Sequence, residues 1–158
     1  MSVQTYGDRQ ILLHWAVVGL VAFQFATGGG MSNAFDNGLT AGNTGGTAIV
    51  HGLLGSLLLL AMLARAWTRR QYGAPPPPET EPEVLQKISR GNHMAFYVVL
   101  IAMPIAGILA VLTGSEIVGT IHAWTSKLLL VLVAAHLAGA IWHMFKEDGV
   151  VSRMFSRN

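Results

Sequence analysis

The sequence predicts an all-α integral membrane protein, a four-helix bundle formed by residues 1–158 as a single domain. Composition is the first reason, because 52% of the residues are hydrophobic and only 11% are charged, against about one quarter charged in soluble domains. The second reason is that four segments are long and apolar enough to cross a bilayer core of about 30 Å. The chain leaves no segments from which a soluble layer could be built to cover them.

Four apolar segments define the predicted spans. They are Ile11 to Thr27, Ala48 to Trp67, Met94 to Leu112 and Ile121 to His143. The first span lacks a small-residue cleavage site and carries His14 and Gln24 within its apolar run. We therefore expect it to remain in the protein rather than to be removed as a signal sequence.

Basic residues predict the orientation of the spans. Nine of the ten fall on one side of a four-span arrangement, namely Arg9, Arg65, Arg69, Arg70, Lys87, Arg90, Lys146, Arg153 and Arg157. Loops rich in Lys and Arg stay in the cytoplasm. We therefore expect a multi-pass protein of the bacterial inner membrane with both termini and the connection 68–92 in the cytoplasm.

The connections between the predicted spans differ in composition. The cytoplasmic connection 68–92 contains four consecutive prolines, which favour an extended, semi-rigid path and block helix formation. The connections 28–47 and 113–120 contain no Lys or Arg and should face outward. The first of these is rich in Gly, Asn and Thr and shows no helical periodicity, so we expect it to be irregular.

Six histidines and the absence of cysteine limit the chemistry of the chain. Without cysteine there is no thiolate metal site and no CxxCH motif, so any haem must be held by coordination alone. His122 and His136 are fourteen residues apart. This spacing is close to four helical turns, so both lie on one helix face, about 21 Å apart. One histidine therefore belongs to each leaflet.

Histidines at equal depth on facing helices are typical of bundles that hold b-type haem, with iron between two imidazoles. The outer half supplies one pair, His51 and His122. The inner half supplies four candidates for two positions: His14, His93, His136 and His143. The last is the weakest, because it lies about 31 Å from His122 along the helix, at the membrane surface. Two pairs would give two stacked haems.

Rival metal sites fit less well. Catalytic zinc usually requires three clustered ligands and di-iron bundles require carboxylates, yet the four predicted spans contain no Asp or Glu. Small residues near the histidines leave room for a flat macrocycle, namely Gly19, Gly52, Gly55, Ala135 and Gly139. Gly107 and Gly114 are better explained by plain helix packing.

Four motifs give the chain a family resemblance. They are His-Trp in the first span, VHGLLGSLLLLAMLARAWTRR in the second, GNHMAFYVVLIAMPIAGIL in the third and H-x13-H in the fourth. Over nearly its whole length the chain resembles the bacterial cytochrome b561 family, including its diheme superoxide oxidase type. The resemblance implies two non-covalent haems b and electron exchange with the quinone pool, with ubiquinone as acceptor.

The resemblance also implies a set of haem ligands. The family's ligand positions match His14, His51, His122 and His136, and neither His93 nor His143 is needed. Equal depth pairs His51 with His122 in the outer half and His14 with His136 in the inner half.

Two basic residues near the predicted haems suggest further roles. Lys127 is the sole basic residue in the outer half. It either snorkels to the surface, pairs with a haem propionate, or draws a small anion such as superoxide by electrostatic steering. Arg65 is either a propionate partner or a positive-inside anchor. Candidate quinone ligands are Trp15, Arg65 and His93 on the inner side and Trp124 and Ser126 on the outer side.

Two classes of function fit these residues. In the first, the protein is a self-contained oxidoreductase that passes electrons from superoxide to ubiquinone. In the second, it is a non-catalytic diheme conduit, acting as membrane anchor of a periplasmic dehydrogenase or as a subunit of a respiratory complex. The short outer connections offer no docking domain, which favours the first class. The expected partners are the lipid bilayer and a membrane quinone, and no nucleic acid.

Overall fold

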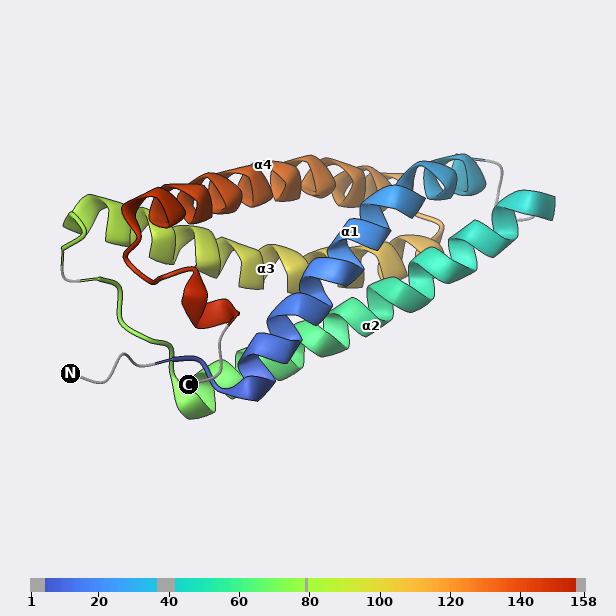
Figure 1. Ribbon diagram of the computed structural model, residues 1–158. Helices are drawn as coiled ribbons and strands as arrows, with labels where there is room; N and C mark the ends of the chain where they lie inside the picture. The colour runs from blue at the N-terminus through green and yellow to red at the C-terminus, as the bar shows by residue number, and fades with distance from the viewer. Residues whose placement is uncertain (1–4, 37–41, 79, 156–158) are drawn as a thin grey trace.

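The computed structural model describes residues 5–36, 42–78 and 80–155, and four long α-helices account for most of them (Figure 1). They are α1 (Asp8–Asp36), α2 (Gly42–Tyr72), α3 (Glu83–Thr113) and α4 (Glu116–Lys146), followed by the short 3-10 helix η1 (Ser152–Met154). Within the described ranges no strand occurs. The predicted all-α four-helix fold is confirmed.

The four helices are long and apolar enough to cross a membrane. The candidate spans are Asp8–Gly28, Gly46–Tyr72, Glu83–Thr113 and Glu116–Lys146. Large apolar side chains are exposed on their outer faces, for example Leu60 at 63% and Leu112 at 76%. Soluble monomers rarely expose apolar patches of this extent, so these faces suit contact with lipid.

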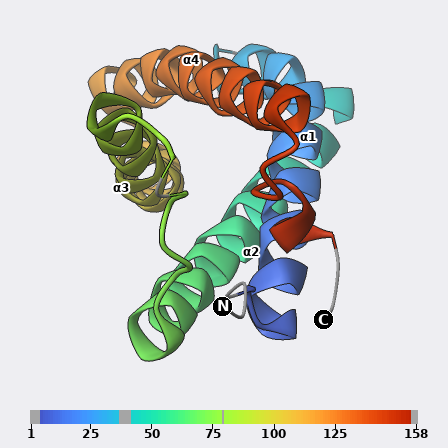
Figure 2. The ribbon, with the colours of Figure 1, turned by 60° about the vertical axis from the view of Figure 1, so that its left-hand side comes forward.

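The buried core is small and lies where the helices meet. It consists of Val17, Leu58, Met62, Val99, Leu100 and Leu129. Helix α1 packs along α2, α3 packs along α4, and α2 also contacts α3. Figure 2 shows the helices around one axis in the order of the chain, so that α2 faces α4 across the bundle.

A tight turn between α3 and α4 makes these helices antiparallel neighbours. Gly114 ends α3 in the left-handed region with φ 62°, a conformation that glycine adopts without steric cost. Ser115 then caps α4, because its hydroxyl accepts a hydrogen bond from the Val118 N–H at 3.4 Å. The expected role of Gly114 in plain helix packing is therefore wrong, since it forms the turn.

Each helix extends beyond its predicted apolar span. The expected loop over 68–92 is wrong, because α2 continues to Tyr72 and α3 begins at Glu83, which leaves 73–82 as the connection. The proline run within it is non-helical, as predicted. The expected irregular segment 28–47 is also largely helical, and only 37–41 lies outside the described residues. Extending an existing helix costs far less than starting one, so the helices continue into polar sequence.

Both described chain ends and the connection 73–82 lie at one end of the bundle (Figure 1). We call this the basic end, because the helix termini there carry Arg9, Arg69, Arg70, Lys87, Arg90 and Lys146. The other end, with the α1–α2 and α3–α4 connections, is the opposite end.

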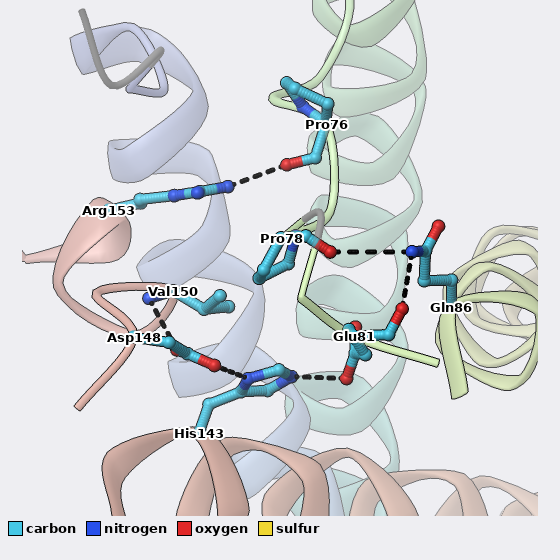
Figure 3. Close-up of polar contacts among 8 residues, drawn as sticks. All are labelled: Pro76, Pro78, Glu81, Gln86, His143, Asp148, Val150 and Arg153. Carbon is cyan, nitrogen blue, oxygen red and sulfur yellow. Dashed lines mark hydrogen bonds and ion pairs between the residues drawn. The ribbon is translucent and has the colours of Figure 1, made fainter. Parts of the chain in front are cut away.

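At the basic end, the segment 147–155 is fastened to the connection 73–82 (Figure 3). The His143 imidazole lies between two carboxylates, with Nδ1 2.7 Å from Asp148 Oδ2 and Nε2 3.3 Å from Glu81 Oε1. Arg153 Nη1 donates to the Pro76 carbonyl at 2.9 Å. The side chains of His143, Glu81 and Asp148 are largely buried. His143 is thus engaged at the surface of the bundle.

Replacing His143 by glutamine should release this segment. The glutamine cannot contact both carboxylates as the two ring nitrogens do, and leaving a buried polar group without its partner costs about 1–3 kcal/mol. We expect faster hydrogen exchange of residues 147–155. The control is Glu83→Gln, which breaks the exposed Lys87–Glu83 pair (3.4 Å) and should change nothing measurable. Equal exchange in both variants would contradict a fastening role for His143.

The same cluster gives the segment an acid sensitivity. Burial raises the pKa of Asp148, but hydrogen bonds from His143 and from the Val150 N–H lower it by more. The pKa of Asp148 therefore lies below its ordinary value of 3.8. A carboxyl whose pKa is lowered by folding stabilises the folded state above its unfolded pKa, and this contribution is lost as pH falls through the lowered value. Acid below about pH 4 should therefore loosen the segment.

Candidate functional site

Five histidines gather inside the bundle in two groups at different depths. Near the opposite end, the rings of His51 on α2 and His122 on α4 have centroids 6.2 Å apart. Nearer the basic end, the rings of His14 on α1 and His136 on α4 are also 6.2 Å apart. His93 on α3 lies 5.4 Å from His136. The structure thus brings both predicted pairs together and adds His93 to the second.

The pair near the opposite end is held by contacts from α1 and α3. His122 Nδ1 lies 2.9 Å from the Met103 carbonyl oxygen. His51 Nδ1 lies 3.5 Å from Thr27 Oγ1, and the Gln24 amide donates to the His51 carbonyl at 3.1 Å. The Met103 carbonyl thus orients the His122 imidazole, whereas Gln24 holds the backbone of His51.

Two glycines make these contacts possible. A Cβ at Gly107 would lie 3.0 Å from His122 Cε1, and a Cβ at Gly55 would lie 2.9 Å from Gln24 Nε2. Gly107 serves helix packing as expected, and the group of α4 that it admits is the His122 ring. The sequence alone does not show that Gly107 contacts a histidine, because the contact depends on how α3 and α4 are aligned along each other, and no local motif encodes that alignment. By contrast, Gly19, Gly52 and Gly139 are exposed, and a Cβ at any of them would meet nothing within 4 Å.

Arg65 lies near the pair closer to the basic end and has an unused donor. Its Nη1 is buried without a hydrogen-bond partner. The side chain lines a small cavity with polar and aromatic groups, namely Tyr6, Gln10, Thr68, Arg69, Tyr97 and Met154. The Arg69 guanidinium lies 5.6 Å from the centre of the Tyr97 ring. A buried guanidinium with a free N–H suits an anionic group, and the sequence alone did not indicate Arg69 or Tyr97 as its neighbours.

Lys127 points toward the opposite end. Its Nζ lies 3.8 Å from the centre of the Trp124 ring, an arrangement in which the ring's electrons attract the cation. Trp124 is exposed. The lysine thus has an aromatic partner that the sequence alone did not indicate.

Two of the candidate quinone ligands donate hydrogen bonds within the protein. The Trp15 indole N–H donates to the Met154 carbonyl at 3.0 Å, and the Ser126 hydroxyl donates to the Ala123 carbonyl at 2.7 Å. Their polar groups are therefore occupied, in contrast to the guanidinium of Arg65.

A membrane four-helix bundle that joins histidines of different helices at two depths has the architecture of a b-type cytochrome. Comparison with known families agrees, because residues 5–157 match the model of the prokaryotic cytochrome b561 family, and the chain therefore belongs to that family. It is also similar to cytochrome b562 of Cereibacter sphaeroides, with 26% identity over 151 residues and 94% of each chain covered.

Family membership confirms the resemblance drawn from the four motifs. The protein is a multi-pass bacterial membrane protein that binds haem b and transfers electrons.

Proposed function

We propose that the protein holds two haems b, one between His51 and His122 and the other between His14 and His136. The ring spacing is the observation that supports this most. A metal–imidazole nitrogen bond is about 2 Å long, so imidazoles on opposite sides of one metal have centroids about 6 Å apart. Both pairs have 6.2 Å, whereas His93 and His136 are closer, at 5.4 Å.

Another residue fits the same group. The unpartnered Arg65 Nη1 suits a haem propionate. With no cysteine in the chain, attachment is non-covalent. Bound haem supplies one-electron transfer, and the chain contributes axial ligands, orientation and electrostatics.

For the overall reaction, we propose electron transfer from superoxide at the outer face to ubiquinone. Each superoxide loses one electron and becomes O₂, and a quinone takes up two electrons and two protons to become a quinol. Lys127 supports an anionic donor, because it is the sole basic residue in the half of the protein proposed to face outward. At the basic end, Arg65 serves either as the haem propionate partner or as a quinone ligand, since its buried Nη1 has no hydrogen-bond partner and its side chain lines the cavity there.

Lys127→Gln is expected to slow the reduction of the purified chain by superoxide. Electrostatic steering raises association rates and weakens with ionic strength, since exposed charges are screened over about 8 Å at physiological salt. Stopped-flow traces of haem reduction should give a lower bimolecular rate and a flatter salt dependence, with haem content unchanged. An unaltered rate would mean that the lysine does not steer superoxide. No superoxide reaction in the unmodified chain would leave the diheme conduit as the better account.

We also propose that the basic end lies in the cytoplasm of the bacterial inner membrane, because Lys and Arg are retained there. A reporter enzyme that works only in the cytoplasm should then be active when it is fused after Asn158, and a reporter that works only in the periplasm should be inactive there. The matched control is a fusion within the α3–α4 connection, which should report the periplasm. Periplasmic activity of the Asn158 fusion would reverse the proposed orientation.

A further inference from the structure

One of the four proposed ligands differs from the others in its hydrogen bonding. His122 Nδ1 lies 2.9 Å from the Met103 carbonyl oxygen. A carbonyl oxygen only accepts hydrogen bonds, so Nδ1 carries the proton and Nε2 is left with the lone pair that a metal requires. His51 Nδ1 is at the limit of a contact with the Thr27 hydroxyl, at 3.5 Å.

The pair nearer the basic end has no equivalent anchor. Across the described ranges, no hydrogen bond reaches a ring nitrogen of His14 or His136. Instead the His136 ring meets aromatic edges, with the Phe96 centroid at 5.6 Å and the His93 centroid at 5.4 Å. Two guanidinium groups, those of Arg65 and Arg69, lie at this end of the bundle. The two sites therefore differ in what surrounds their ligands.

The anchor on His122 depends on close approach of α3. Met103 and Gly107 are one helical turn apart, so they lie on the same face of α3. A Cβ at position 107 would be 3.0 Å from His122 Cε1 and 3.2 Å from Nδ1. An alanine at 107 would therefore force the His122 ring or the two helices to shift by a few tenths of an ångström, which changes the geometry of the contact with the Met103 carbonyl.

We propose that Gly107 and the Met103 carbonyl position the His122 imidazole and lower the reduction potential of the iron that it binds. An imidazole that donates its second N–H becomes a more basic ligand, and a more basic ligand stabilises ferric iron relative to ferrous iron. Near the basic end, no anchor reaches the His14 or His136 ring within the described part of the chain, and two guanidinium groups lie nearby, which together favour the reduced state. The lower potential then lies at the His51/His122 site, and electrons move energetically downhill toward the basic end. This inference rests on the proposed haem ligation.

The test uses Gly107→Ala in a His14→Ala background, in which only the His51/His122 haem should remain. The control is Gly91→Ala in the same background, because Gly91 lies on the same helix and a Cβ there would meet nothing within 4 Å. We expect the alanine at 107 to raise the potential by about 59 mV, a tenfold change in the reduction equilibrium of a one-electron couple. The ferric EPR signal of this haem should change as well. The Gly91 variant should leave both unchanged.

A potential that is equal in the two glycine variants would overturn the inference. If Gly107→Ala instead loses this haem, redox titration of the unmodified chain decides the question, with each haem assigned from the His14→Ala and His122→Ala variants. The inference then requires the His51/His122 haem to have the lower potential, and an equal or higher value would overturn it. An unmodified chain without two haems would contradict the proposed function instead, so the two failures are distinguishable.

Discussion

Replacing His122 by alanine is expected to remove one of two haems and to leave the other intact. Alanine offers no lone pair to iron, and the partner imidazole of His51 cannot fill both axial positions. A pyridine haemochrome assay on the purified chain should fall from two haems per polypeptide to one. His51→Ala should give the same product, whereas His136→Ala should remove the other haem.

The control for this series is His143→Gln, which changes a histidine of the same helix. Its ring already lies between Glu81 and Asp148, so both haems should be retained even though the segment 147–155 loosens. One haem or none in the unmodified chain would refute the two-haem proposal. Loss of both haems from every variant would mean that the sites fold as one unit.

The number and type of the helices could be predicted from the sequence, but their ends could not. Bilayer thickness sets a minimum length of apolar sequence, and this signal identified all four helices. It carries no information about where helical hydrogen bonding stops. Helix α3 therefore begins at Glu83, in polar sequence, eleven residues before the predicted Met94. Pro82 is the N-cap of α3, and a proline disfavours helical conformation in the residue before it.

The depth of the histidines was predictable, but their surroundings were not. Helical spacing alone placed His122 and His136 on one face of α4, and charge placed His51 in the same half as His122. The acceptor for His122 is a backbone carbonyl on α3, and its availability depends on the glycine at 107. Contacts of this kind follow from the register between helices, which no single motif specifies. The link between His143 and Glu81 likewise depends on the path of the connection 73–82.

His14→Ala is expected to abolish the bis-histidine spectrum of the haem nearer the basic end, whereas His93→Ala should preserve it. Both histidines face His136, but only His14 has the 6.2 Å centroid separation that suits an iron between two imidazoles, since two metal–nitrogen bonds of about 2 Å must fit between the rings. The His93 ring, at 5.4 Å and edge-on to His136, is closer than the separation expected for an intervening iron, so we expect it to pack against the His136 ring instead.

Reduced-minus-oxidised spectra and low-temperature EPR of the two purified variants separate these roles. In His14→Ala, the low-spin signal of this haem should disappear, while the His51/His122 haem stays unchanged and serves as the internal standard. In His93→Ala, both low-spin signals should remain, with a modest shift in the signal of the haem bound by His136, because an aromatic neighbour of that ligand has been removed. The reverse result, with loss in His93→Ala and retention in His14→Ala, would make α3 rather than α1 the source of the second ligand.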